Sequence, residues 1–396
     1  MPSRAVPSPP PTRFVHLDEA RSRFGAQVDR LGTLFTVGDP LADQAAAALA
    51  SLPRAEREAL VASALAEGID ACPKAPEPLR ALFATLDHTP FWVDTKRAAR
   101  GGRAFLATGI AGGFALAFAS LVLGYCSPAG NKPLAFSGRL RENAPRRLAE
   151  TSRFVQAVSL PGGMGRFADG FAIAVRVRLM HAQVRRMCLA APGWDRGAWG
   201  TPINQVDMAG TVLLFSLIVI DGLAKLGFPL RANGSEDLLH LWRHVGVVLG
   251  VAEELLPASE REARRLWDLI ASTQEGPDAD ARALASALIE GGVQRATTPE
   301  GRQEASRRAA IGYGLSRYLI GHEVADALGY PRPTWSVALP ALSAALRAIV
   351  GAVRRVGPLE DWLASVGERR WEAVVTAGLG ATPATFAIPE SLAVSR

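Results

Sequence analysis

The segment FAIAVRVRLMHAQVRRMC, residues 171–188, carries the clearest helical pattern in this chain of 396 residues. Apolar side chains recur along it at steps of four, three, four and three residues, at Ile173, Val177, Met180, Val184 and Met187. Side chains at these spacings share one face of an α-helix. The segment therefore predicts a helix over residues 167–190 with this apolar stripe turned toward the core.

A second stripe on the same segment is polar. Arg178, His181 and Arg185 follow one another at steps of three and four residues, so they share a helix face. Two flanking guanidinium groups disfavour a third positive charge and keep the imidazole neutral, which is the form that binds a metal. A haem group needs such an axial ligand, an apolar slot and cationic partners for its propionates. The alternative is a histidine bonded to a backbone carbonyl beside arginines in surface ion pairs.

A second cluster precedes this helix. Arg147, Glu150, Thr151 and Phe154 line one face of a helix expected over residues 143–158. A carboxylate beside a hydroxyl and a guanidinium can hold a proton or orient bound oxygen. The alternative is an ordinary intrahelical Arg–Glu pair on a solvated surface.

The rest of the chain also predicts helices. Ala, Leu, Arg and Glu dominate segments that Gly and Pro separate, and a β-sheet is hard to place. Expected helices span residues 76–87, 104–124, 143–158, 167–190, 206–226, 236–251, 257–273, 278–290, 301–326, 335–354 and 358–375. No repeat of 20 to 50 residues stands out, so we expect a compact all-α bundle.

Composition divides the chain into four parts. Prolines near the start predict a disordered tail over residues 1–15, and short helix-forming stretches predict an N-terminal helical segment over residues 16–75. The main domain then covers residues 76–375 and holds both polar clusters. Residues 376–396 are expected to form a loosely ordered C-terminal tail.

Charge and cysteine content exclude several classes of protein. The 44 Lys and Arg exceed the 38 Asp and Glu by six, but no basic run of five occurs, so nucleic acid is not an expected partner. The three cysteines have no framework spacing, which argues against a disulfide scaffold. The first residues lack an apolar signal core, so we expect a cytoplasmic protein.

Two apolar stretches resemble membrane spans. Residues 104–125 carry no charge, and residues 208–228 are interrupted only by Asp221 and Lys225. The first is long enough to cross a bilayer, but its many Gly and Ala residues also suit a central helix packed on all sides. We favour a core helix, with a membrane-surface contact as the alternative.

Other motifs carry less weight. His240 and His244 stand one turn apart but lack the Glu of a zincin motif, so packed histidines are favoured over a metal site. Residues 163–168 match a glycine fingerprint without a surrounding parallel sheet, so a turn is favoured over a nucleotide site. The pair His322 and Glu323 reads as a helix-surface pair, and no GxSxG elbow of a hydrolase is present.

Together these residues resemble a known family. The set Arg178-x-x-His181-x-x-x-Arg185, preceded by Arg147-x-x-Glu150-Thr151, is similar to the motifs of the latex clearing protein and fungal oxygenase family, the rubber oxygenase catalytic domain. Segments 90–94, 200–208, 242–246 and 314–317 fit the same pattern. The resemblance covers roughly residues 76–345.

The resemblance implies a globin-like helical core, with additional helices, around one non-covalent haem b. It makes His181 the axial iron ligand, and it places Arg178, Arg185 and, less directly, Arg317 in the haem neighbourhood. The distal Arg, Lys and Thr of the rubber-cleaving members correspond here to Arg147, Glu150 and Thr151. The lysine is thus replaced by Glu150, and an ionised carboxylate accepts hydrogen bonds but cannot donate them.

The expected function is therefore a haem b-dependent oxygenase that uses dioxygen on an apolar alkene, terpenoid, polyketide or lipid-like substrate, with cleavage of a C=C bond. Glu150 would act as proton shuttle or base, positioned by Arg147 and Thr151. Two alternatives remain: a haem or apolar-ligand binding protein without turnover, and a membrane-surface protein anchored by residues 104–125. No feature of the sequence identifies an electron donor.

Overall fold

The computed structural model describes residues 9–136 and 144–380, together with positions 384 and 386. All regular secondary structure in these residues is helical, which confirms the predicted all-α class. The helices up to residue 190 are α1 (Leu17–Phe24), α2 (Gln27–Leu34), α3 (Pro40–Ala50), α4 (Arg54–Ala66), α5 (Glu77–Leu86), α6 (Thr95–Leu106), α7 (Ile110–Ala115), α8 (Leu121–Tyr125), α9 (Pro128–Phe136), α10 (Ala144–Ser159) and α11 (Asp169–Ala190).

The later helices complete the body. They are α12 (Arg196–Trp199), α13 (Gln205–Phe215), α14 (Leu217–Lys225), α15 (Ala232–Val248), α16 (Glu260–Ser272), α17 (Ala279–Arg295), α18 (Pro299–Ile320), α19 (His322–Ala327), α20 (Leu339–Val353) and α21 (Gly357–Leu379). Short 3₁₀ turns are η1 (Ile69–Ala71), η3 (Glu253–Leu255) and η4 (Thr334–Ala338), and η2 (Leu116–Ser120) is a π-helical turn between α7 and α8.

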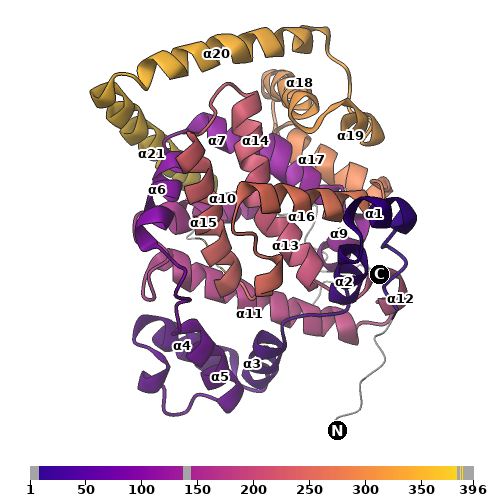
Figure 1. Ribbon diagram of the computed structural model, residues 1–396, viewed down its shortest axis with the longest axis vertical. Helices are drawn as coiled ribbons and strands as arrows, with labels where there is room; N and C mark the ends of the chain where they lie inside the picture. Colours follow the sequence, from indigo (N-terminus) through magenta and orange to yellow (C-terminus); the bar gives the residue numbers. More distant parts are fainter. Residues whose placement is uncertain (1–8, 137–143, 381–383, 385, 387–396) are drawn as a thin grey trace.

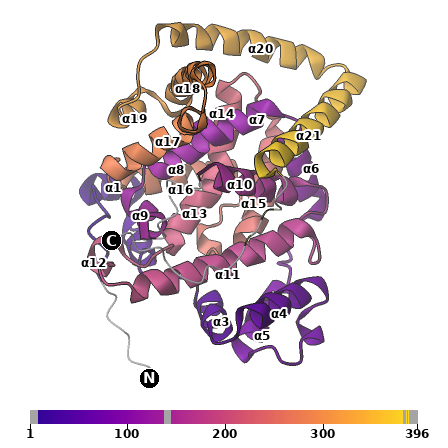
Figure 2. The same ribbon diagram turned by 180° about the vertical axis from the view of Figure 1, so that it is seen from behind.

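Helix α11 divides the molecule into two unequal parts. Figure 1 shows it crossing the lower part of the body, with α3, α4 and α5 below it and most other helices above. One apolar core nevertheless runs from Phe14 to Trp371, so the N-terminal helices and the later ones share it. At the opposite end, α20 crosses the body at a distance from α11, as both views show (Figures 1 and 2).

Close contact between helices fixes the centre of the bundle. Helix α6 packs along α15, and a Cβ atom at Gly101 would lie only 2.2 Å from the carbonyl oxygen of Asp237. Only glycine permits the two backbones to meet at this distance. Beside this contact, the carboxylate of Asp237 is buried and accepts hydrogen bonds from Arg97 and Arg100.

Most helix predictions are confirmed, and three need correction. The helix expected over residues 301–326 is divided into α18 and α19 at Gly321, where φ is 93°. The helix expected over residues 104–124 is wrong, because the chain breaks between α6 and α7 and the two helices meet at an angle of 89°. The helix expected over residues 206–226 is divided at Ser216, whose hydroxyl donates to the carbonyl of Val212 at 2.8 Å. A serine that bonds the preceding turn in this way bends a helix.

The predicted tails also need correction. Residues 9–15 belong to the body rather than to a disordered tail: Arg13 and Phe14 are buried, and Arg13 forms an ion pair with Asp207 at 2.8 Å. At the other end, α21 continues to Leu379, beyond the start of the predicted C-terminal tail at residue 376. The local amino-acid composition does not predict the structure of these segments, because contacts with distant residues hold them in place.

The predicted apolar stripe of α11 is buried less than expected, and two arginines of the polar stripe are buried more. Ile173 is buried, but Val177, Met180, Val184 and Met187 are only partly buried. The fully buried side chains instead include Arg178, Ala182 and Arg185, which face the small residues of α3. The polar stripe therefore anchors the helix, and the apolar stripe remains partly open.

Two helical stretches among the described residues are long and apolar enough to cross a membrane, by length and composition alone. Gln205–Lys225 is 67% buried inside the body, whereas Thr334–Val353 is only 11% buried. The bent pair Thr95–Leu106 and Ile110–Tyr125 would count as a third if it formed one span. Core packing of Phe105, Ala115 and Val122 accounts for the absence of charged side chains from residues 104–125.

Candidate functional site

Helix α11 carries the central candidate residues, and Arg178 fixes its position. The Arg178 guanidinium donates to both carboxylate oxygens of Asp39, at 2.7 and 3.1 Å, and to the carbonyl of Val248 at 3.4 Å. Both side chains are buried, with 8% and 5% of their surface exposed. Asp39 precedes α3 and also caps it by accepting from the Ala42 amide. The pair thus joins α11 to the start of α3.

Arg185 makes a second attachment two turns further along α11. It donates to the carbonyls of Pro202 at 3.0 Å and Ile203 at 2.8 Å, and it forms an ion pair with Asp43 on α3. Burial raises the pKa of Asp43, although the Arg185 charge opposes this shift. Arg185 therefore ties α11 to α3 and to the loop before α13.

These ion pairs correct one step of the sequence reasoning. Arg178 and Arg185 were expected to disfavour protonation of His181 as two unbalanced positive charges, but Asp39 and Asp43 offset them. The two arginines were also predicted to support a haem neighbourhood, and their contacts show instead how they support the helix that carries His181. They hold α11 in place, and their role toward a cofactor stays a prediction.

His181 lies between the anchored face and the partly open apolar face of α11. The residue is half-buried, and its Nδ1 atom is fully buried. Val177 lies one turn before it and Val184 one turn after it, and both are also half-buried. An imidazole bordered by partly exposed aliphatic side chains is suited to a flat, apolar group that covers them and takes one nitrogen as ligand.

Helix α10 packs beside α11 and carries the second cluster. Glu150 and Thr151 are half-buried on it. The carboxylate of Glu150 accepts from Nε of Arg146 at 3.1 Å, and Arg146 also donates to the carbonyl of Leu379 at the end of α21. Arg146, which helical spacing did not single out, is thus a partner of Glu150, and the side chain of the predicted Arg147 lies outside the described residues.

Arg317, the third predicted arginine, holds a different part of the fold. Its side chain is buried, and it donates to the carbonyls of Tyr330 and Pro331 and forms an ion pair with Asp326 at 2.7 Å. These partners belong to α19 and the segment after it. The contacts assign Arg317 to the attachment of α19 and do not join it to His181.

The family-like segment 200–208 also carries structural contacts. Gln205 donates to the carbonyls of Gly38 and Gly250 and accepts from the amide of Ala252 at 2.7 Å. Asn204 caps α13 by accepting from two backbone amides. These side chains close the loops around the Arg178–Asp39 pair, so the segments before α13 and after α15 support the same anchor.

The two histidines of α15 do not form a metal site. Nε2 of His240 accepts from the amide of Asp94 at 2.9 Å, which occupies the lone pair that a metal would need. His244 is buried, and burial together with the His240 charge lowers its pKa to about 4. Within the described ranges, no group of three or more His, Cys, Asp or Glu residues is arranged to hold a metal ion.

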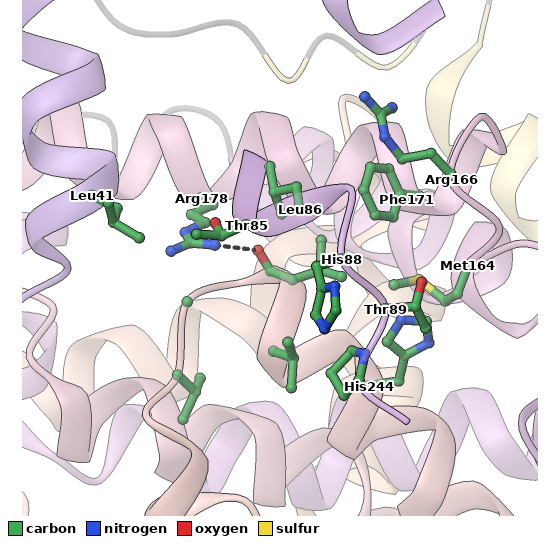
Figure 3. A pocket seen from close by; sticks show the side chains of 15 residues that line it. Leu41, Thr85, Leu86, His88, Thr89, Met164, Arg166, Phe171, Arg178 and His244 are labelled. Atoms are coloured by element: carbon green, nitrogen blue, oxygen red, sulfur yellow. Dashed lines mark hydrogen bonds between the residues drawn. The ribbon is translucent and has the colours of Figure 1, made fainter. Parts of the chain in front are cut away.

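A small cavity lies on the anchored side of α11. Figure 3 shows Arg178, His88, His244 and Met164 facing it. Its volume is about 210 Å³, below the roughly 300–1,000 Å³ of typical pockets for drug-sized ligands. His181 is not among its lining residues, so this cavity is separate from the partly open apolar face.

The glycine motif at 163–168 forms the turn that leads into α11, as predicted, with the Gly163 amide donating to the carbonyl of Leu160.

Comparisons with known proteins agree with the motif resemblance. The family model described as ER-bound oxygenase mpaB/B'/Rubber oxygenase, catalytic domain, matches residues 107–355, which is more than half of the chain. A rubber oxygenase of Streptomyces sp. (strain K30) is 26% identical over 266 residues, which make up 64% of this chain and 61% of that protein. The matched part therefore spans less than two thirds of that relative.

The fold has a counterpart among solved structures. The structure of latex clearing protein LCP in the closed state matches with a TM-score of 0.65 and 21% identity, over 86% of this chain and 90% of that one. At this identity the likeness shows a shared fold. Together with the family model, it confirms the resemblance that the motifs of α10 and α11 indicated: the chain belongs to the family of the ER-bound oxygenase mpaB/B' and rubber oxygenase catalytic domain.

Proposed function

We propose that this protein is a haem b-dependent oxygenase of an apolar substrate, built on a globin-like core, with His181 as the axial iron ligand. The observation that carries the proposal is the placement of His181 between Val177 and Val184 on a firmly anchored helix. Family membership adds relatives whose names describe oxygenases. An iron in haem needs only such axial ligation from the protein.

The residues of α11 would hold the group through position and charge. The Nδ1 atom of His181 is buried within the protein, so Nε2 would be the nitrogen that ligates the iron. The ion pairs of Arg178 and Arg185 fix the axial position of this helix. Val177 and Val184 would lie against the macrocycle and lose their remaining contact with water.

The residues of α10 would supply acid–base chemistry. The haem, when bound, would supply the activation of dioxygen, and both oxygen atoms would end in the two carbonyl products of C=C cleavage, so no external reductant would be needed. The Glu150 carboxylate would take an allylic proton from the substrate and return it as the carbonyl products form, so that the net reaction balances. Arg146 holds one oxygen of this carboxylate, and Thr151, one residue further along α10, would orient the carboxylate or the oxygen together with the predicted Arg147.

One observation favours a second candidate. The Glu150 carboxylate accepts a hydrogen bond from Arg146, and an ionised carboxylate cannot donate to bound oxygen as a lysine does. A protein that binds haem or an apolar ligand without turnover would fit this change. Oxygen consumption with a set of alkenes separates the two functions, because the binding protein would consume none.

The ultraviolet–visible spectrum of purified protein tests the cofactor and its ligand. We expect a Soret band that shifts when carbon monoxide binds to the reduced protein. We expect His181→Ala to lose or alter this band. His322→Ala is the matched control, because His322 is exposed on α19 and should leave the spectrum unchanged. A wild-type protein that stays colourless after haem is supplied would refute the proposal.

A further inference from the structure

Helix α20 is an apolar helix that lies largely exposed on the surface of the molecule. The stretch Thr334–Val353 is long and apolar enough for a membrane, yet only 11% of it is buried. Its outward positions on α20 are small or aliphatic and exposed, at Ala341, Leu342, Ala345, Ala348, Ile349 and Ala352. An apolar surface of this kind on a folded protein indicates an interaction site.

The body holds α20 along its surface rather than perpendicular to it. Arg347 donates to the carbonyl of Ala224 at 2.7 Å, and Arg354 donates to that of Pro229. Between these contacts, a Cβ atom at Gly227 would lie 2.5 Å from the Ser343 carbonyl, so the two backbones touch there. Figures 1 and 2 show the helix lying across the end of the body opposite α11. It can therefore lie flat in an interface but cannot cross a bilayer.

Charge and aromatic side chains around α20 match a lipid surface. From Arg332 to Val356 the chain has four arginines and no acidic residue, and Arg355 is exposed. Trp335 precedes the helix and Trp362 follows it, with 40% and 56% of their surfaces exposed. Tryptophan is enriched at the level of lipid headgroups, and arginines near a membrane are attracted by anionic lipids.

An apolar cavity of about 260 Å³ lies beneath α20. Helices α7, α14, α18 and α20 all contribute to its lining, which includes Phe114, Phe228 and Leu342. Two of its polar lining residues are engaged elsewhere: Lys225 donates to the carbonyl of Leu319, and Tyr318 donates to that of Lys225. Leu342 faces this cavity and is also half exposed to the outside, so the cavity adjoins the outer apolar surface.

We propose that α20 is a peripheral docking site for an anionic lipid bilayer, with its outer apolar face in the headgroup region and the exposed Arg355 on the lipid phosphates. An amphipathic surface helix binds membranes in this way through buried apolar area and electrostatic attraction. Here the protein body takes the place of the polar helix face. The proposal does not rest on the proposed function, because docking needs neither haem nor turnover.

Sedimentation of the full chain with lipid vesicles tests the site. We expect the protein to pellet with vesicles of equimolar phosphatidylcholine and phosphatidylglycerol and much less with phosphatidylcholine alone. The double substitution Ala345→Glu and Ile349→Glu, which avoids the cavity lining, should weaken partitioning about tenfold or more. Arg355→Gln should weaken it about fivefold on anionic vesicles only.

The matched control places two glutamates on another exposed apolar surface. Leu160 and Phe167 are 42% and 66% exposed at the turn between α10 and α11, so Leu160→Glu with Phe167→Glu should bind vesicles like the wild type. A second measurement leaves α20 itself unchanged. Brominated lipids should quench the fluorescence of Trp335 and Trp362, and this quenching should be lost when each tryptophan is replaced by phenylalanine. Circular dichroism confirms that each variant is folded.

Three outcomes would overturn the proposal. The wild type stays in solution with both kinds of vesicle, or the α20 double variant pellets as well as the wild type, or the control variant loses binding equally. Light scattering without lipid addresses a second copy of the chain as occupant: a dimer that Ile349→Glu converts to a monomer would assign this face to self-association instead of lipid.

Discussion

Removal of one partner from the Arg178–Asp39 pair should destabilise the protein strongly. The substitution Arg178→Met keeps most of the side-chain volume but leaves the Asp39 carboxylate, 5% exposed, without its guanidinium. Loss of one member of a buried ion pair costs about 3–5 kcal/mol because the other charge stays buried. Asp39→Ala also removes the cap of α3, which adds about 1 kcal/mol. Either loss is a large part of a typical total of about 5–15 kcal/mol.

Urea unfolding of the single and double variants measures these costs. The double variant Arg178→Met with Asp39→Ala should lose much less than the sum of the single losses, because no unpaired charge remains. The control is Arg308→Met, which breaks an exposed pair with Glu304 and should change stability by less than about 1 kcal/mol. A loss within about 1 kcal/mol for Arg178→Met, or additive losses in the double variant, would refute the reasoning.

The same variants separate two roles of Arg178 toward the proposed haem. If the arginine acts by anchoring α11, Asp39→Ala and Arg178→Met should both lower the fraction of protein that retains haem under conditions where both are folded. If the guanidinium instead binds a propionate, Asp39→Ala should leave haem occupancy intact, since it releases Arg178 from its present partner. Absorbance of the Soret band per protein chain gives the answer.

Two further predictions concern Glu150 and His244. Glu150→Gln should lower oxygen consumption with an alkene substrate about a hundredfold while the haem spectrum stays the same, because an amide accepts no proton; unchanged turnover would remove Glu150 from the mechanism. Burial lowers the pKa of His244 from 6.5 to about 4. Between these pH values the folded protein therefore binds fewer protons than the unfolded chain. The neutral His244 thus contributes to the free energy of unfolding above pH 6.5, and this contribution is lost as the pH falls toward 4. Between pH 6.5 and 4, the free energy of unfolding should fall by up to about 3 kcal/mol less in His244→Gln than in the wild type. The exposed His322→Gln variant is the control. Parallel pH curves for His244→Gln and the wild type would contradict the assignment.

Local patterns were enough for the helices that carry the candidate site. The periodicity of residues 167–190 and 143–158 predicts α11 and α10 to within two residues, because helical side-chain spacing is a local property. The same spacing correctly places Arg178, His181 and Arg185 on neighbouring positions of one helix. The motif order across both helices also identified the family, which the family model confirms.

The partners of these residues were not predictable from spacing. Asp39 lies 139 residues from Arg178 and Asp43 lies 142 residues from Arg185, so only tertiary packing brings them together. Glu150 has two neighbouring arginines within helical reach, Arg146 and Arg147, and Arg146 also meets the Leu379 carbonyl at the end of α21. The packing of α10 against α21 thus gives Arg146 a second partner that helical spacing does not indicate.

The sequence by itself determined the all-α class, the two site helices and the family of this protein. The tertiary structure alone decided which side of α11 is anchored and which apolar segment is left uncovered. Hydropathy ranks Gln205–Lys225 and Thr334–Val353 nearly alike, at 1.9 and 1.7, yet 67% of the first and 11% of the second are buried. Hydropathy belongs to a segment, whereas burial depends on what packs against it, and that information comes from residues far away in the chain.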